Sequence, residues 1–192
     1  MSKIEVDTIE PQSGTSLTLG ASGDTITIPS GATIDLSSAT QTGVGGVNTP
    51  AFEATQTSSQ TISNTTVTKI QFGTEVFDSD SCFDSTTNYR FTPTTAGKYH
   101  MYAQAIFDTN AANQLYAAII RIRKNGSDIT NASQAYTGNN SSYSGTASLS
   151  YNTTIDMNGT TDYLEVFGYI QVSAGTPSIV QGRFGAFKLI GA

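Results

Sequence analysis

The chain has 192 residues, 12% of them charged, with a formal net charge of −6 and a single cysteine. This length fits one sizeable domain with an appendage, and Ser, Thr, Gly and Asn recur in place of helix-forming runs, which predicts an all-β protein. The nine basic residues are scattered, so we expect no nucleic-acid partner. No segment approaches the roughly 20 apolar residues of a membrane helix, so we expect no membrane insertion.

A repeated motif marks the N-terminal part, residues 1–48. Apolar pairs recur at intervals of nine and then eight residues: Leu17 and Leu19, Ile26 and Ile28, Ile34 and Leu36. Each pair puts two side chains on one face of a short strand, and glycines turn the chain between pairs. One such ribbon cannot bury its own apolar face, so we expect several copies to wrap round a common axis as a stalk. The alternative is a flexible linker rich in Ser, Thr and Gly.

From residue 49 to residue 192 the sequence alternates between apolar and polar positions in short runs separated by turns, which is typical of a β-sandwich or jelly roll. Residues 147–157 precede Asn158-Gly159, and residues 162–172 follow it, so we predict that these two strands pair as a hairpin. A second hairpin is expected around Asn125-Gly126. The final run, residues 183–190, is apolar on both faces, which suggests burial between its own sandwich and a neighbour.

The run 97–107 contains the only histidine of the chain, His100. Strand alternation predicts that Tyr99, Met101 and Phe107 face the core, and that His100, Tyr102 and Gln104 lie on the opposite face. A general base needs a partner held in geometry, and no second histidine is present. We therefore predict no catalytic residues and expect His100 to lie at an interface, where it could respond to pH.

The order of the motifs resembles the globular head of the complement-one-q and tumour necrosis factor superfamily. Phe91, Pro93, Gly97 and Tyr99 stand where that family has its Phe-rich strand, turn and Gly-x-Tyr strand, and Phe184, Phe187 and Leu189 stand in its closing strand. The resemblance implies a jelly roll that forms trimers, with the face of His100, Tyr102 and Gln104 turned to the threefold axis. The head core predicted from both arguments is Phe91, Tyr99, Met101, Phe107, Phe184, Phe187 and Leu189.

The N-terminal segment "SKIEVDTIEP" and the ribbon behind it resemble tail-fibre and other virion structural proteins of tailed phages, in particular those of cyanophage type. This resemblance implies a homotrimeric fibre located in the virion and assembled in the host cytoplasm. Its N-terminal segment would attach to another virion protein, and its head would contact a host surface glycan or protein. A capsid decoration protein or head fibre is one alternative. A glycan depolymerase is another, although no pair of carboxylates can be nominated for it.

The segment "FDSDSCFDST" contains Cys82 and three aspartates at alternate spacing, Asp78, Asp80 and Asp84. The acidic surroundings disfavour a thiolate, so we expect an inert thiol. The aspartates could offer oxygen ligands to calcium, but solvated acidic loops are common, and we predict neither a metal site nor a cofactor.

Two further groups offer surface chemistry. Arg121, Arg123 and Lys124 could meet phosphate or carboxylate groups of a glycan, or pair with acidic residues across a subunit boundary. The tyrosines and asparagines of residues 136–145 suit contact with carbohydrate or protein, and they include Tyr136, Asn139, Asn140 and Tyr143.

Overall fold

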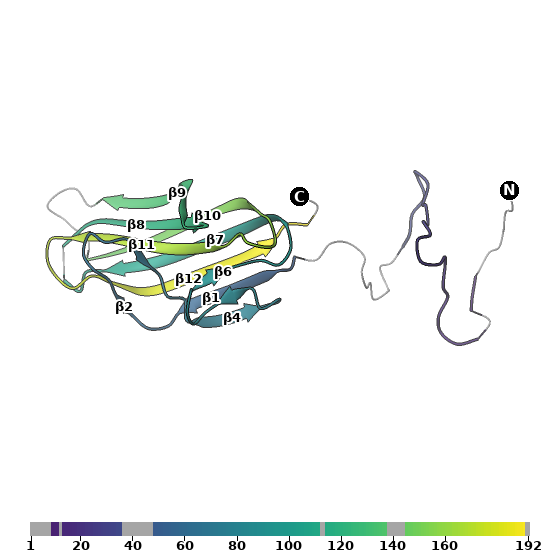
Figure 1. Ribbon diagram of the computed structural model, residues 1–192, viewed down its shortest axis with the longest axis horizontal. Coiled ribbons are helices and arrows are strands. Elements are labelled where there is room, and N and C mark those ends of the chain that lie inside the picture. Colours follow the sequence, from purple (N-terminus) through teal and green to yellow (C-terminus); the bar gives the residue numbers. More distant parts are fainter. Residues whose placement is uncertain (1–8, 12, 36–47, 112–113, 138–144, 191–192) are drawn as a thin grey trace. The chain divides into compact units, whose positions relative to one another are not determined.

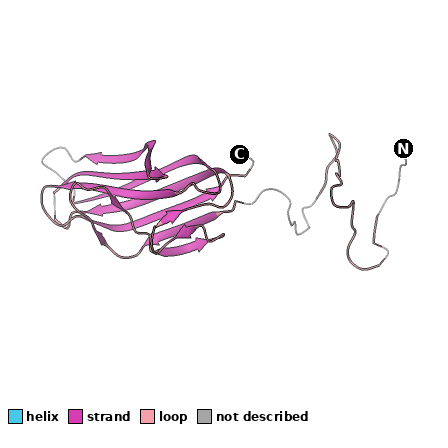
Figure 2. Cartoon of the chain, viewed as in Figure 1, coloured by secondary structure: helices cyan, strands magenta, loops and turns pink. Residues whose placement is uncertain are grey.

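The computed structural model describes residues 9–11, 13–35, 48–111, 114–137 and 145–190, with residues 130–137 described by their backbone alone. The chain divides into two units, Met1–Val44 and Gly45–Ala192, so the division falls four residues before the predicted boundary at residue 48. Every regular element of the described residues is a strand (Figure 2). No helix long and apolar enough to cross a membrane occurs in them.

The N-terminal unit has turns where glycines were expected to supply them. Gly20, Gly23 and Gly31 all have positive φ angles, which glycine adopts at little steric cost. Two turns are closed by backbone hydrogen bonds, from Asp24 N to Ala21 O and from Ala32 N to Pro29 O. No residue of the described stretch 13–35 belongs to a strand in this single chain. The short strands expected there are absent because a lone ribbon has no neighbouring strand to accept its backbone hydrogen bonds.

Two antiparallel sheets form the larger unit (Figure 1). The first sheet has the order β10-β7-β12-β1-β4, with β2 added beside β12. Its strands are β1 (Ala51–Gln56), β2 (Gln60–Thr61), β4 (Thr74–Asp78), β7 (Gly97–Asp108), β10 (Thr146–Met157) and β12 (Ser178–Lys188). The second sheet has the order β5-β6-β11-β8-β9, with β3 added beside β11. Its strands are β3 (Thr68–Lys69), β5 (Phe83–Asp84), β6 (Arg90–Phe91), β8 (Leu115–Lys124), β9 (Ser127–Thr137) and β11 (Leu164–Val172).

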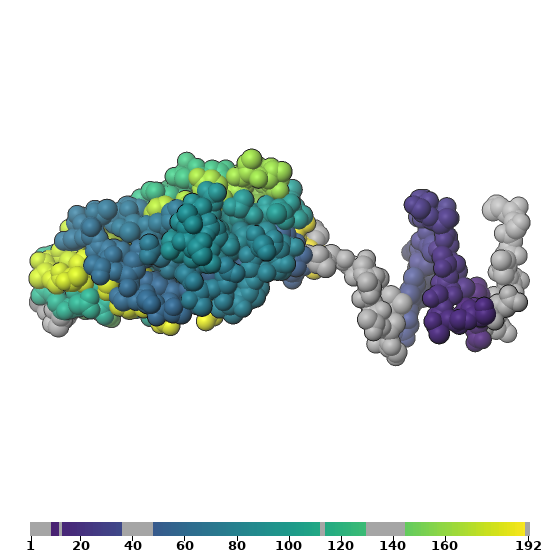
Figure 3. All heavy atoms as spheres, turned by 60° about the horizontal axis from the view of Figure 1, so that its bottom comes forward, coloured from purple at the N-terminus to yellow at the C-terminus, as the bar shows by residue number. Residues whose placement is uncertain are grey.

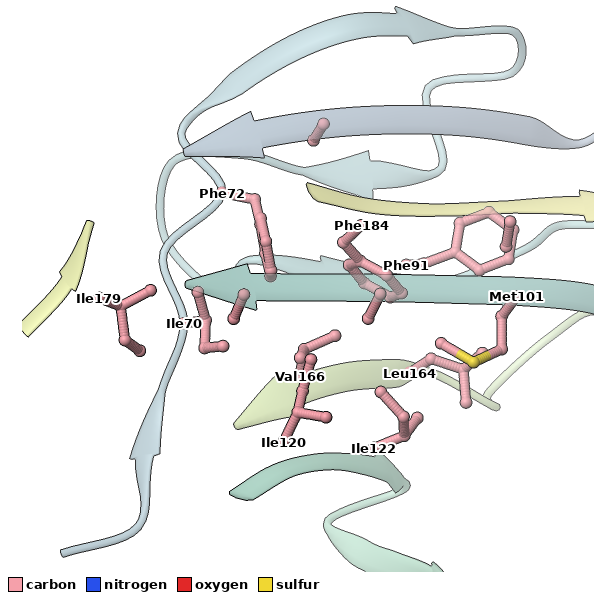
Figure 4. Packing of buried hydrophobic residues seen from close by; sticks show 14 of the residues in the cluster. Ile70, Phe72, Phe91, Met101, Ile120, Ile122, Leu164, Val166, Ile179 and Phe184 are labelled. Atoms are coloured by element: carbon pink, nitrogen blue, oxygen red, sulfur yellow. The ribbon is translucent and has the colours of Figure 1, made fainter. Parts of the chain in front are cut away.

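The hydrophobic core lies between the two sheets and contains several phenylalanines, of which Figure 4 labels Phe72, Phe91 and Phe184. Phe52 stacks on Phe83 and Phe91 with ring centroids 4.5 and 4.6 Å apart, and meets Phe184 edge-on at 4.9 Å. Offset and edge-on ring pairs of this kind add about 0.5–1.5 kcal/mol each to the burial of the rings. Five of the predicted core residues are fully buried: Phe91, Tyr99, Met101, Phe107 and Phe184.

The prediction that Phe187 and Leu189 belong to this core is wrong. Both side chains are half-buried, and neither joins the core cluster. The cause is strand parity, because Phe184 and Ala186 of β12 point inward and Phe187, one residue further on, points to the opposite face. The apolar character of β12 on both faces, which the sequence indicates, therefore puts an aromatic ring on the outside of the sandwich.

Of the two predicted hairpins, one is confirmed. β8 and β9 pair across Asn125-Gly126, whose φ angles of 53° and 79° are those of a tight hairpin turn. The pairing predicted across Asn158-Gly159 is wrong, because β10 pairs with β7 in the first sheet and β11 pairs with β8 in the second. Asn158 instead starts a turn that carries the chain between the sheets, and its Oδ1 accepts hydrogen bonds from the next three backbone N–H groups after Gly159.

The segment from β2 to β6 consists of short strands joined by irregular connections. In the space-filling view this segment, coloured blue to teal, covers most of the face of the head turned to the reader (Figure 3). Several of its backbone groups bond to β11, including Ile70 N to Val166 O and Thr65 N to Ile170 O. These bonds attach the irregular segment to the second sheet.

Candidate functional site

The first sheet exposes a face that no other part of the described head covers, and we call it the outward face. It comprises the side chains that point away from the core: His100, Tyr102, Gln104 and Ile106 of β7, Arg183 and Phe187 of β12, and Glu53 and Thr55 of β1. The parity predicted for β7 is confirmed, because Tyr99, Met101 and Phe107 are fully buried while the residues between them are partly or largely exposed.

A tyrosine, a glutamate and an arginine form a network at the centre of the outward face. The Tyr102 hydroxyl donates a hydrogen bond of 2.6 Å to Glu53 Oε2, reaching across β12 from β7 to β1. This reach is possible because Gly185 lies between them, where a Cβ atom would come within 2.4 Å of the Tyr102 ring and hydroxyl. Burial, together with the hydrogen bond to the carboxylate, raises the pKa of Tyr102 above its usual value, so the hydroxyl remains a donor.

Arg183 completes this network loosely. Its Nη1 lies 3.6 Å from Glu53 Oε1, and its side chain is 55% exposed. A charge-assisted hydrogen bond between these groups would measure about 2.7–2.9 Å. The guanidinium therefore lies close enough to attract the Glu53 carboxylate, but no short hydrogen bond holds the arginine side chain in place.

His100 packs against Phe187, with ring centroids 5.4 Å apart. In the described residues, no hydroxyl, thiol or carboxylate is hydrogen-bonded to the imidazole. General-base catalysis requires such a geometry. The site thus offers an aromatic surface, and the interface role of His100 stays a prediction.

The acidic segment around Cys82 uses its carboxylates to shape the loop. Asp78 accepts hydrogen bonds from the backbone N–H groups of Cys82 and Phe83 at 3.0 and 2.8 Å. Asp84 accepts from the backbone of Thr86, Thr87 and Asn88, and these bonds hold its pKa well below the usual range.

No group of three or more metal-ligating side chains occurs in the described part of the chain. The Cys82 thiol is buried, and its burial raises its pKa, which opposes formation of a reactive thiolate.

The basic residues of β8 are paired within the chain. Arg121 Nη1 and Arg123 Nε bond to the two carboxylate oxygens of Asp128 at 2.9 and 2.6 Å, and Lys124 Nζ lies 2.7 Å from Asp162 Oδ2. The Arg123 guanidinium also lies over the Phe167 ring at 4.3 Å. Each of the three basic side chains therefore has an acidic partner within its own chain, with two arginines sharing one carboxylate, which is an arrangement that the sequence did not suggest.

The remaining predicted sites have two different outcomes. Leu17, Leu19, Ile26, Ile28 and Ile34 are all 45–61% exposed in the single chain. Leu36 lies outside the described residues, as do Asn139, Asn140, Tyr143 and the side chain of Tyr136.

Two important residues of the outward face, Glu53 and Gly185, were missed by sequence reasoning. In the sequence, Glu53 has the pattern of an ordinary solvated residue of β1. Its hydrogen-bond partner, Tyr102, is 49 positions away. The only available signal was the glycine inside the apolar run 183–190, since a glycine within a strand often marks a close approach of neighbouring groups.

Comparison with known proteins places the larger unit in a fold class. A scan of protein-family models and a search of curated proteins gave no match to the chain. Among solved structures, the globular domain of the zebrafish complement 1qA protein is similar, with a TM-score of 0.51 and 17% sequence identity. The match covers 73% of this chain and 97% of that one. The head therefore has the jelly-roll sandwich fold of a complement-one-q globular domain, and at this level of identity the likeness concerns the fold alone.

Proposed function

We propose that this chain is a non-enzymatic structural protein of a tailed-phage virion, a fibre in which three copies join along the stalk and present three heads. The observation that carries the proposal is the exposure of the five described Leu and Ile side chains of the repeated pairs. A regular series of large apolar side chains left in water within one chain favours burial against further copies of the same series.

The free energy available from such burial is large enough to hold an assembly. Fully burying a Leu or Ile side chain contributes about 1.5–3 kcal/mol, and side chains that are already half-covered would gain roughly half of that. Five such residues give roughly 4–7 kcal/mol per chain. Multiplied by three, this sum is of the size needed to offset the entropy lost on association.

The outward face supplies a second contact surface for the same assembly. The sequence resemblance implies that His100, Tyr102 and Gln104 face the threefold axis of a trimer. The head has the fold from which this expectation comes. The ring of Phe187 lies on this face beside His100, which adds apolar area to it. Contact between copies here would join the heads as well as the stalks.

The mechanism proposed is attachment by avidity. Three identical heads on one axis turn weak contacts with a host glycan or protein into durable binding, because the second and third contacts form at high effective concentration. The N-terminal segment would hold the fibre on another virion protein. Antibody labelling of particles tests the location, and label on projecting fibres is expected. Particles without label contradict the proposal, and label spread over the capsid would instead favour the decoration role.

Enzymatic cleavage of the glycan receives no support from two hollows on the described part of the head surface. Two hollows, of about 680 and 310 Å³, are lined by uncharged residues and one arginine, and neither includes an Asp or Glu. A glycosidase needs two carboxylates about 5–9.5 Å apart across its cleft. We expect incubation with host surface polysaccharide to release no reducing ends, and their release would overturn the non-enzymatic part of the proposal.

Replacement of the stalk residues tests the assembly. Ile26→Asn with Ile28→Asn removes one apolar pair and should lower the mass in light scattering from that of a trimer towards that of a monomer. Ser30→Asn, in the turn that follows, is the matched control and should leave the mass unchanged. A double variant that keeps the wild-type mass would show that the apolar pairs do not join the chains.

A further inference from the structure

The outer side of the second sheet gathers basic side chains that are scattered in the sequence. Leu164 and Val166 of β11 are fully buried in the core, so the residues that alternate with them, Glu165 and Phe167, point to the other side of the sheet. The strand register places four basic residues directly opposite these two, and we call this set the cationic face: Lys69 of β3, Arg90 of β6, and Arg121 and Arg123 of β8. It contains four of the nine basic residues of the chain.

Three carboxylates lie beside the cationic face, which leaves one positive charge in excess on a chain whose net charge is −6. Glu165 lies 2.5 Å from Lys69 Nζ, and its side chain is only 8% exposed, so it presents little negative charge to solvent. Asp84 gives its oxygens to neighbouring backbone N–H groups. The third carboxylate, Asp128, is the one with a largely exposed side chain.

Asp128 leaves most donors of its two arginines unused. It accepts one hydrogen bond from Arg121 Nη1 and one from Arg123 Nε. A guanidinium carries five N–H donors, and no further acceptor bonds to either arginine among the described residues. The two side chains are 31% and 27% exposed. A planar guanidinium with unused donors can bind a carboxylate through two parallel hydrogen bonds.

An aromatic ring orients the basic side chains before any ligand arrives. The Arg123 guanidinium lies over the Phe167 ring at 4.3 Å, and Lys69 Nζ lies 5.8 Å from the same ring centroid. Cation–π contacts of this kind are attractive and restrict the long side chains. Binding therefore costs less side-chain entropy than it would for freely moving arginines.

Apolar surface continues the cationic face along the same strands. Tyr169 follows Phe167 on the outer side of β11 and lies opposite Ile119 of β8, and both side chains are partly exposed. A tyrosine offers a flat apolar ring and a hydroxyl, which match the C–H face and the hydroxyl groups of a sugar. One excess positive charge is little for a nucleic-acid backbone, whose binding depends on neutralising several phosphates. The combination of arginine and tyrosine favours a sugar that carries a carboxylate.

We propose that the cationic face binds an acidic polysaccharide through the carboxylate groups of its uronic acid units. Arg121 and Arg123 take a carboxylate, while Tyr169 and Ile119 pack against the C–H face of an adjoining ring. This inference rests on the proposed attachment function and names the ligand class and the part of the head that contacts it.

The cationic face is compatible with the proposed trimer. The outward face belongs to the first sheet, and the cationic face lies on the opposite side of the sandwich, on the second sheet. Copies that meet through their outward faces therefore leave this site open. Three such sites on one fibre would bind one polysaccharide chain together.

Calorimetric titration of the full chain with a hyaluronan hexasaccharide, which contains glucuronic acid, tests the assignment. Saturable binding is expected, and the hexasaccharide with its carboxyl groups reduced to alcohols should bind at least tenfold more weakly. A thymidylate oligonucleotide should also bind at least tenfold more weakly. Absence of saturable binding, or equal binding of either comparison ligand, overturns the proposal.

Variants locate the site, and one of them should improve it. Arg121→Gln and Tyr169→Ala should each weaken binding of the hexasaccharide at least fivefold. Asp128→Asn should strengthen it at least threefold, because this change removes the carboxylate that competes for the two arginines. A loss of folding cannot produce such a gain.

The matched control is Lys98→Gln, which removes one positive charge from an exposed side chain of β7, outside the cationic face. It should bind as the wild type does. Equal loss in this control, full binding by Arg121→Gln, or unimproved binding by a folded Asp128→Asn variant contradicts the site.

Light scattering and thermal melting of the same samples separate the two proposals. A folded trimer that does not bind the hexasaccharide removes the ligand assignment and leaves the fibre in place, whereas a monomer overturns the fibre whatever it binds.

Discussion

Replacement of Gly185 by alanine should break the polar network at the centre of the outward face. An ideal Cβ at this position lies 2.4 Å from both Cζ and Oη of Tyr102, which is more than 1 Å inside van der Waals contact. The Tyr102 ring must swing away, and its 2.6 Å hydrogen bond to Glu53 is then lost. A hydrogen bond to a charged group contributes about 1.5–3 kcal/mol, so the free energy of unfolding should fall by about that amount.

The assay is urea denaturation of the full chain at one fixed protein concentration, because any self-association makes the stability depend on concentration. Tyr102→Phe removes the same hydrogen bond without a clash, so the double variant with Gly185→Ala should be markedly less destabilised than the sum of the two single changes. Gly73→Ala is the control, since its new Cβ would meet its nearest atom only at 3.9 Å. A Gly185→Ala variant within about 0.5 kcal/mol of the wild type, or strictly additive effects, would refute the reasoning.

Three further predictions follow from other parts of the head. Gly159→Ala should cost more than about 2 kcal/mol, because the residue has a φ of 73° and a Cβ would lie 2.2 Å from the backbone nitrogen of Ala96; an unchanged melting temperature would contradict this. Alkylation of Cys82 at neutral pH should be slower than that of free cysteine and should accelerate in urea, since burial raises the thiol pKa; equal rates in the folded and unfolded chain would be inconsistent with a buried thiol. The pKa values of Asp84, Asp128 and Asp162 are lowered by their hydrogen bonds, so the stability that these carboxylates contribute is present above about pH 4 and is lost as the pH falls below that value. Melting temperatures measured from pH 6 to pH 3 should therefore decline at the acid end, less steeply for Asp84→Asn, and a flat profile would argue against these shifts.

The sequence predicts the class of fold and the facing of individual strands because both depend on local alternation. The parity of β7, from Tyr99 to Phe107, follows directly from the period of two, and the turn at Asn125-Gly126 follows from its dipeptide. Neither signal identifies the neighbour with which a given strand pairs in the sheet. This is why the Asn158-Gly159 dipeptide predicts a hairpin, although the two strands that flank it lie in different sheets.

The candidate sites were harder to predict because they depend on neighbours that are distant in sequence. The partner of Tyr102, Glu53, enters from another strand, and the cationic face depends on the register of β3, β6 and β8 against β11, which alternation does not encode. The basic residues of β8 give another example. Asp128 pairs with two of them, and the sequence pattern does not predict this pairing. The proposed burial of the stalk pairs would require several chains, and one chain shows only that the five described Leu and Ile side chains are exposed.

The most direct test of the proposed fibre is the mass of the purified full chain in solution, measured by light scattering at neutral pH. One chain has a mass of 20.2 kDa, and the account predicts three times this value, 60.6 kDa. A mass of 20.2 kDa that persists as the protein concentration is raised would contradict the trimeric fibre.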